Sequence, residues 1–169
     1  KGIDVGHLPN TIKVIGTNCF ALTEHNVTEY RIPDSIESLA QGAFRQRNRT
    51  LVNNLDLSNY TRLTTLSSYL FYNIAFDCDL VIPSQVTTVG LCFNYNGSFK
   101  NITITNGVEN MQQQCFGSDT SAPVSNFYLQ TVTFQRETPP QTVGYQVFGT
   151  HNITNGFKIY VPDTAVEEY

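Results

Sequence analysis

The four cysteines are the most reactive side chains of this 169-residue chain. Cys19, Cys92 and Cys115 each come directly before a Phe, at a position where a small apolar side chain recurs. A buried free cysteine behaves as such a side chain, so we expect three buried free thiols. A Cys92–Cys115 disulfide stays open as an alternative, although neighbouring Cβ atoms in a ladder would point in parallel instead of converging. Cys78 has no cysteine partner at the spacing of a metal site.

The remaining chemically active residues form no catalytic or metal-binding pattern. The histidines recur at no shared position of the chain: His7, His25 and His151. The sequence contains no nucleophile elbow, Gly-rich phosphate loop or H-E-x-x-H segment. The carboxylate pairs Asp77/Asp79 and Glu167/Glu168 could form an acid–base pair, but acids at a strand edge or a chain end are more often simply solvated. We therefore predict no enzymatic activity, no metal and no cofactor.

Charge and hydropathy exclude two classes of partner. The net charge is −4 and the isoelectric point is near 5.2, whereas a nucleic-acid-binding domain needs a basic face. The one basic cluster, Arg45, Arg47 and Arg49, is expected to be solvated loop surface. No apolar run approaches the roughly 18 residues of a membrane span. Because the chain opens at Lys1 without a charged and then apolar segment, we expect any secretion signal to have been removed or to be absent.

A repeat organises the whole chain. A Phe preceded by a small or apolar residue recurs six times, at Phe20, Phe44, Phe71, Phe93, Phe116 and Phe148. An aliphatic residue or Met precedes each Phe by four or five positions, and a second apolar cluster recurs in phase. The unit approximates L-x-x-I-x-I-P-x-x-V-x-x-(I/V)-G-x-x-A-F. We predict one array over residues 1–169 with about six to seven coils, starting near residues 3, 27, 52, 77, 99, 129 and 156.

The unit predicts a β-dominated solenoid. Its L-x-x-I-x-I part ends with period two, so Ile102 and Ile104 should point to one face of a short strand. Pro or a polar residue then ends the strand, because Pro cannot donate to a ladder. The chain returns past a second aliphatic residue, and the Phe fills the interior. One coil cannot bury its own apolar side, but stacked coils can, and their strands then form a parallel sheet.

Residues between the inward positions of these strands should project from the sheet as a candidate binding face. They are polar, mixed in charge and poor in aromatic side chains except near the C-terminal end, so they lack the features of an energetic hot spot. A solvated face without a partner therefore stays an open alternative. The candidate face consists of His7, Glu29, Arg31, Asn54, Asp56, Asp79, Asn101, Thr103, Thr131, Thr133, Lys158 and Tyr160.

Two segments carry a family resemblance: residues 32–44, IPDSIESLAQGAF, and residues 82–93, IPSQVTTVGLCF. They closely resemble the BspA-like leucine-rich repeat family, and the resemblance covers residues 3 to 169. It implies a right-handed superhelix with a parallel sheet on the concave face and short irregular or 3₁₀ segments on the convex face. It further implies a secreted or surface-anchored protein, usually bacterial and sometimes from parasitic protists, that takes part in adhesion. The chain departs from the pattern in an insertion around residues 118–126 and in lacking a visible anchor.

From these observations we predict a non-enzymatic, extracellular or cell-surface binding module that acts as a monomer. Its expected partner is a protein or glycan bound through the concave face, with no nucleic acid and no membrane span. A structural spacer that displays another domain is the first alternative. A carbohydrate-active enzyme domain is the second.

Overall fold

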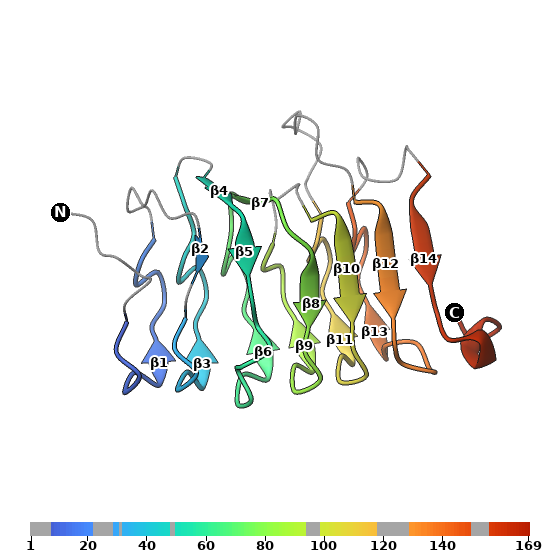
Figure 1. Ribbon diagram of the computed structural model, residues 1–169, viewed down its shortest axis with the longest axis horizontal. Coiled ribbons are helices and arrows are strands. Elements are labelled where there is room, and N and C mark those ends of the chain that lie inside the picture. Colours follow the sequence, from blue (N-terminus) through green and yellow to red (C-terminus); the bar gives the residue numbers. More distant parts are fainter. Residues whose placement is uncertain are drawn as a thin grey trace.

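A computed structural model describes residues 8–21, 29–30, 32–47, 50–93, 99–117, 129–149 and 156–169, without the side chains of residues 29, 30 and 50. Successive coils stand side by side along the long axis of the molecule, with β1 (Val14–Ile15) and β14 (Lys158–Tyr160) near its opposite ends (Figure 1). Every strand pair is parallel and joins two coils. The fold class predicted from the repeat, a β-dominated solenoid, is confirmed.

The first row of strands forms the expected sheet. Its four-stranded part has the order β14 (Lys158–Tyr160), β12 (Thr131–Phe134), β10 (Asn101–Ile104) and β8 (Leu80–Ile82). Nearer the N-terminus, β2 (Glu29–Tyr30) pairs with β5 (Asn54–Leu55), and both lie in the same row in Figure 1. Alternate residues of β10 and β12 are buried, as a strand with one face on the core requires.

The return segment of each coil is more regular than the family resemblance implies. It forms a second parallel sheet in the order β13 (Thr142–Val143), β11 (Asn110–Met111), β9 (Thr88–Val89) and β6 (Thr65–Leu66). A matching pair, β1 (Val14–Ile15) with β3 (Ser38–Leu39), lies near the N-terminus. A third pair, β4 (Thr50–Val52) with β7 (Ile74–Phe76), and the 3₁₀ turn η2 (Asp163–Ala165) complete the elements described.

Phenylalanine rings run through the interior as one continuous stack. Five of the six repeat phenylalanines are buried, and Phe148 at the C-terminal end is partly buried. Neighbouring rings are nearly parallel, at interplanar angles of 8 to 14°, with centroids 5.5 to 5.9 Å apart. Such offset stacking adds to the stability that area burial gives. Because each ring contacts the ring of the next coil, the stack helps to set the position of each coil relative to its neighbours.

A backbone ladder runs beside the rings. The N–H of each Phe donates to the carbonyl of the residue before the next Phe, as in Phe20 N to Ala43 O at 2.8 Å and Phe116 N to Val147 O at 2.9 Å. In five coils the residue two before the Phe has a positive φ, which turns the chain into the interior: Asn18, Gly42, Tyr69, Gln114 and Gln146. Gly42 and Asn18 favour this conformation, but Tyr69, Gln114 and Gln146 adopt it rarely, so in their coils the stacked neighbours impose the turn.

Candidate functional site

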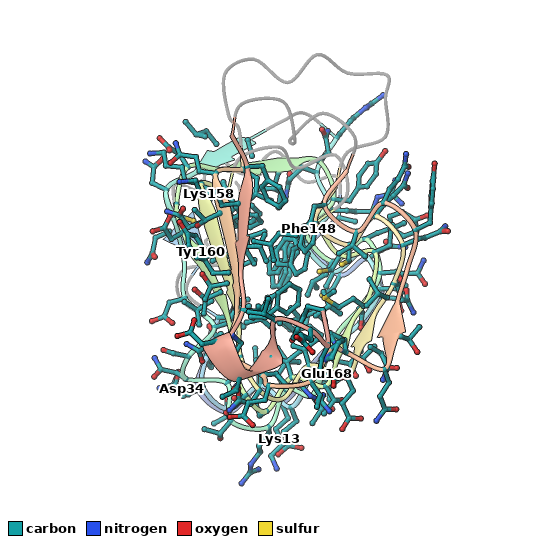
Figure 2. The ribbon with its side chains drawn as sticks, turned by 90° about the vertical axis from the view of Figure 1, so that its right-hand side faces the viewer. Lys13, Asp34, Phe148, Lys158, Tyr160 and Glu168 are labelled. Atoms are coloured by element: carbon teal, nitrogen blue, oxygen red, sulfur yellow. The ribbon has the colours of Figure 1, made fainter. Side chains whose placement is uncertain are left out.

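The outward positions of β8, β10, β12 and β14 align in two rows across the coils. Register pairs place Val81, Thr103, Thr133 and Tyr160 in one row. The other row joins Asn101, Thr131 and Lys158. We call these seven residues, with Asp79 before β8, the strand face. Figure 2, which looks along the array onto β14, shows Lys158 and Tyr160 pointing away from the interior that holds Phe148.

Hydrogen bonds between coils tie part of the strand face together. The Asn101 side-chain amide donates to Asp79 Oδ1 at 2.9 Å, and the Thr131 hydroxyl donates to Asn101 Oδ1 at 2.6 Å. Asn101 therefore uses both its donor and its acceptor atom within the face. This row is positioned before any ligand arrives, because rotation of its side chains would break these bonds.

Exposure is uneven across the strand face. The hydroxyl-bearing residues Thr103, Thr131 and Thr133 are half-buried between their neighbours. Val81 and Tyr160, at either end of their row, are 50% and 49% exposed, and Lys158 is exposed. Aromatic area, which dominates many binding sites, is thus confined to the C-terminal end of this face. Val81, which the alternation of the sequence also places outward, is one of the most exposed apolar residues of the face.

The N-terminal part of the candidate face is only partly described. Asn54, the first residue of β5, and Asp56, directly after it, are exposed. The pKa of Asp56 is lowered, first by the Ser58 hydroxyl and then by the Ser58 backbone N–H, which donates to Asp56 Oδ1 at 2.8 Å. Glu29 lies in register with Asn54. The Glu29 side chain, with all atoms of Arg31 and His7, lies outside the part of the chain described.

Of the carboxylates that could have suggested acid–base chemistry, Asp77 and Asp79 each contact another polar group, whereas Glu167 and Glu168 are exposed near the C-terminal end. Asp77 forms an ion pair with Lys100, with Nζ and Oδ1 3.0 Å apart, and Asp79 accepts the Asn101 amide proton. Hydrogen bonding and charge attraction from Asp77 raise the pKa of Lys100. Among the described residues, no group of three or more His, Cys, Asp or Glu side chains is placed to hold a metal ion. The three histidines lie outside the described residues.

All four cysteines are free thiols, but their environments differ. Cys92 and Cys115 are buried as expected, and burial raises the pKa of both thiols well above the ordinary value. Burial also raises the pKa of Cys78, which is only partly exposed. The expectation for Cys19 was wrong, because this thiol is exposed. Cys19 belongs to the first coil described, which lies at the end of the array instead of between two coils.

Comparison with known proteins identifies the family of this repeat array. A family model described as BspA type leucine rich repeat region matches residues 5–122, in six copies. The chain belongs to the BspA-type leucine-rich repeat family. Comparison of the BspA-type chain with curated proteins and with solved structures found no significant match.

The BspA-type array extends past the residues that the family model matches. β12 and β14 both lie beyond residue 122, yet they continue the sheet of β8 and β10 in register. The same holds for β13, which pairs with β11. The strand face is therefore built partly from coils that the family model leaves out. No helix in the described part of the array is long and apolar enough to cross a membrane.

Proposed function

We propose that this BspA-type array is a non-enzymatic module that binds a protein or glycan outside the cell, and that the strand face is its contact surface. The single observation that carries the proposal is the in-register alignment of the outward residues of β8, β10, β12 and β14. Within the described residues no further element pairs over this surface. Leucine-rich repeat solenoids of this family commonly serve as protein-binding scaffolds, which supports the same role.

The rigidity of the array favours binding by the strand face. A ligand that contacts flexible side chains must offset the entropy lost when they are ordered. Here the row of Asp79, Asn101 and Thr131 is already ordered by hydrogen bonds between coils. The stacked phenylalanine rings hold the strands themselves at fixed heights. The face can therefore present hydroxyl, amide and apolar groups to a partner with little further ordering.

A pair of matched variants tests the proposal. In the first, Val81, Thr103, Thr133 and Tyr160 are replaced by Ala, which removes one row of the strand face. In the control, Ser38, Thr65 and Thr142 are replaced by Ala, since these exposed residues point outward from the second sheet. Binding of each purified chain to immobilised matrix proteins and to a glycan array is measured by surface plasmon resonance, after thermal melting shows that both remain folded.

The proposal expects the wild-type chain and the control to bind the same partner equally. The strand-face variant should bind at least about a hundredfold more weakly, since several contacts of about 1 kcal/mol are lost together. Equal binding by all three chains would refute a role for the strand face. If the chain instead hydrolyses an immobilised glycan, the enzymatic alternative would be supported.

A spacer function is the second candidate, and the placement of β1 and β14 favours it. They lie at opposite ends of the stacked coils (Figure 1), so the array separates whatever is attached to each end. A spacer predicts that the strand-face variant changes nothing, whereas deleting one complete coil shortens the reach of an attached domain. Comparing the strand-face variant with the one-coil deletion in one cell-surface display assay distinguishes the spacer function from the binding function.

A further inference from the structure

Two arginines of the basic cluster in the sequence, Arg45 and Arg47, lie between β3 and β4 on a segment that packs beside the next coil. The backbone N–H of Gln46 donates to Tyr72 O at 3.0 Å, and the Asn73 side-chain amide donates to Arg47 O at 2.9 Å. Gln46 is buried, whereas Arg45 is half-buried and Arg47 is exposed. The neighbouring coil therefore holds the backbone that carries both arginines.

A pair of tyrosine rings supports the Arg45 guanidinium. The Arg45 Cζ atom lies over the Tyr72 ring, 5.5 Å from the ring centroid, and the Tyr69 ring meets Tyr72 in a T-shaped arrangement with centroids 5.6 Å apart. Arg45 Nε is buried without a hydrogen-bond acceptor among the described residues. A guanidinium that stacks on a ring keeps the terminal N–H groups at its edge for an anion. Arg45 is thus not the freely solvated side chain expected from the sequence.

Neither arginine is ion-paired with a carboxylate in the part of the chain that the structure describes. The basic side chains of Lys13, Arg62 and Lys100, in contrast, each have an acidic partner. In a chain whose acidic residues outnumber the basic ones by 14 to 10, two unpaired cations on one short segment form a local positive patch. Arg49, the third member of the cluster, lies outside the described residues. We call the patch and its two tyrosines the arginine ledge: Arg45, Arg47, Tyr69 and Tyr72.

We propose that the arginine ledge binds a sulfated polysaccharide through the sulfate groups along its chain. Charge complementarity carries this choice, because a guanidinium offers several N–H donors and a positive charge to the oxygens of an anion. Two residues of chain span at most roughly 7 Å, so Arg45 and Arg47 can contact two sulfate groups at a similar spacing. The inference goes beyond the proposed function, since the ledge belongs to coils that precede β8 and shares no residue with the strand face.

The distribution of charge favours a narrow, linear ligand over an anionic membrane. The chain as a whole carries a net charge of −4, so a flat anionic bilayer would also face acidic surface, whereas a polysaccharide chain contacts only a narrow strip.

The tyrosine rings favour a polysaccharide over a single-stranded nucleic acid, the other common linear polyanion. Proteins bind single strands largely by stacking the bases on exposed aromatic rings. Here Arg45 covers one face of the Tyr72 ring, and Tyr69 and Tyr72 are both half-buried. The rings therefore hold the guanidinium in place and offer little free surface on which a base could stack.

Surface plasmon resonance on immobilised heparin, a sulfated polysaccharide, tests the proposal with the purified whole chain. Arg45→Gln with Arg47→Gln removes both charges of the ledge. Arg45→Lys with Arg47→Lys keeps the charges but removes the planar fork of donors. Lys13→Gln with Arg62→Gln is the matched control, because it removes two exposed positive charges that lie beside Glu37 instead. Thermal melting checks that each variant remains folded.

The wild-type chain and the control should bind heparin equally, and added salt should weaken both. The double Gln variant should bind at least about tenfold more weakly, and the double Lys variant should lie between it and the wild-type chain. If the double Gln variant melts early, Arg47→Gln alone should still weaken binding, because it alters an exposed side chain. Desulfated heparin should compete poorly. The strand-face variant should bind heparin as the wild-type chain does, so a failure of the proposed function leaves this result unaffected.

Equal binding of heparin by the double Gln variant and the control would overturn the proposal. A wild-type chain that does not bind heparin at low salt would also overturn it. Stronger binding to phosphatidylserine vesicles or to single-stranded DNA than to heparin would replace the polysaccharide with a membrane or a nucleic acid as the ligand of the ledge.

Discussion

At the scale of single residues, the phenylalanine stack predicts where truncation is most damaging. Phe93 is fully buried and contacts Phe71 and Phe116 on either side. Phe93→Ala should lower the free energy of unfolding by about 3 to 5 kcal/mol, because the neighbouring rings cannot close a cavity of that size. Phe148→Ala is the control and should be milder, since Phe148 is only partly buried. Urea denaturation measures both, and equal losses would contradict the importance of the central stack.

Glycines at one position of the repeat give a second residue-scale prediction. A Cβ at Gly144 would lie 2.1 Å from the Gln113 backbone nitrogen of the preceding coil, whereas a Cβ at Gly16 would meet nothing within 4 Å. Gly144→Ala should therefore cost about 1 to 3 kcal/mol through overpacking. Gly16→Ala should be neutral or stabilise by up to about 1 kcal/mol, because it restricts the unfolded chain. Similar melting temperatures for the two variants would show that the coils yield more readily than the structure indicates.

At the scale of elements, the sequence predicts the longer strands and misses the shorter ones. Ile102 and Ile104, or Val132 and Phe134, reveal a strand by their period of two. The strands of the second sheet have two residues each, such as Thr88–Val89, and two residues cannot show a period. Their pairing follows from stacking of the coils and not from local propensity. The exposed Cys19 was missed for a related reason, since the repeat pattern alone gives every coil two neighbours.

Ion pairs between coils give an element-scale prediction about pH. Glu37, just before β3, pairs with Arg62 and with Lys13 of the neighbouring coils, the latter at 3.2 Å. Hydrogen bonding from Arg62 and then Lys13 lowers the pKa of Glu37. A lowered folded-state pKa contributes stability above the unfolded-state value, and this contribution is lost as the pH falls through the folded-state pKa.

Glu37→Gln should therefore be less stable than the wild-type chain at pH 7, and the two should converge in acid. The difference should be small and should shrink with added salt, because all three side chains are solvent-exposed. Thermal melting at several pH values and salt concentrations measures it. A difference that persists unchanged in acid would show that Glu37 acts through packing instead of charge.

At the scale of the whole molecule, the pattern of inward and outward residues predicts part of the candidate site. Alternation within β10 and β12 was enough to place Asn101, Thr103, Thr131 and Thr133 outward. The hydrogen bonds from Asn101 to Asp79 and Thr131 depend on the register between coils of unequal length, which no single repeat encodes. The sequence pattern therefore determines which face of the sheet a side chain lies on, and the stacking of the coils determines which residues it contacts on that face.

Because each coil contacts only its neighbours, stability should vary along the array. Three equivalent amides report on this, since each donates to the same position of the preceding coil: Ala40 to Ile15 O at 2.9 Å, Gly90 to Leu66 O at 2.7 Å, and Gly144 to Met111 O at 2.8 Å. Native-state hydrogen exchange should be slowest at Gly90, because opening it disrupts coils on both sides, whereas Ala40 and Gly144 exchange when an end frays. A common exchange free energy at all three amides would mean that the array unfolds as one cooperative unit, and that the stacked rings couple the coils more tightly than nearest-neighbour packing requires.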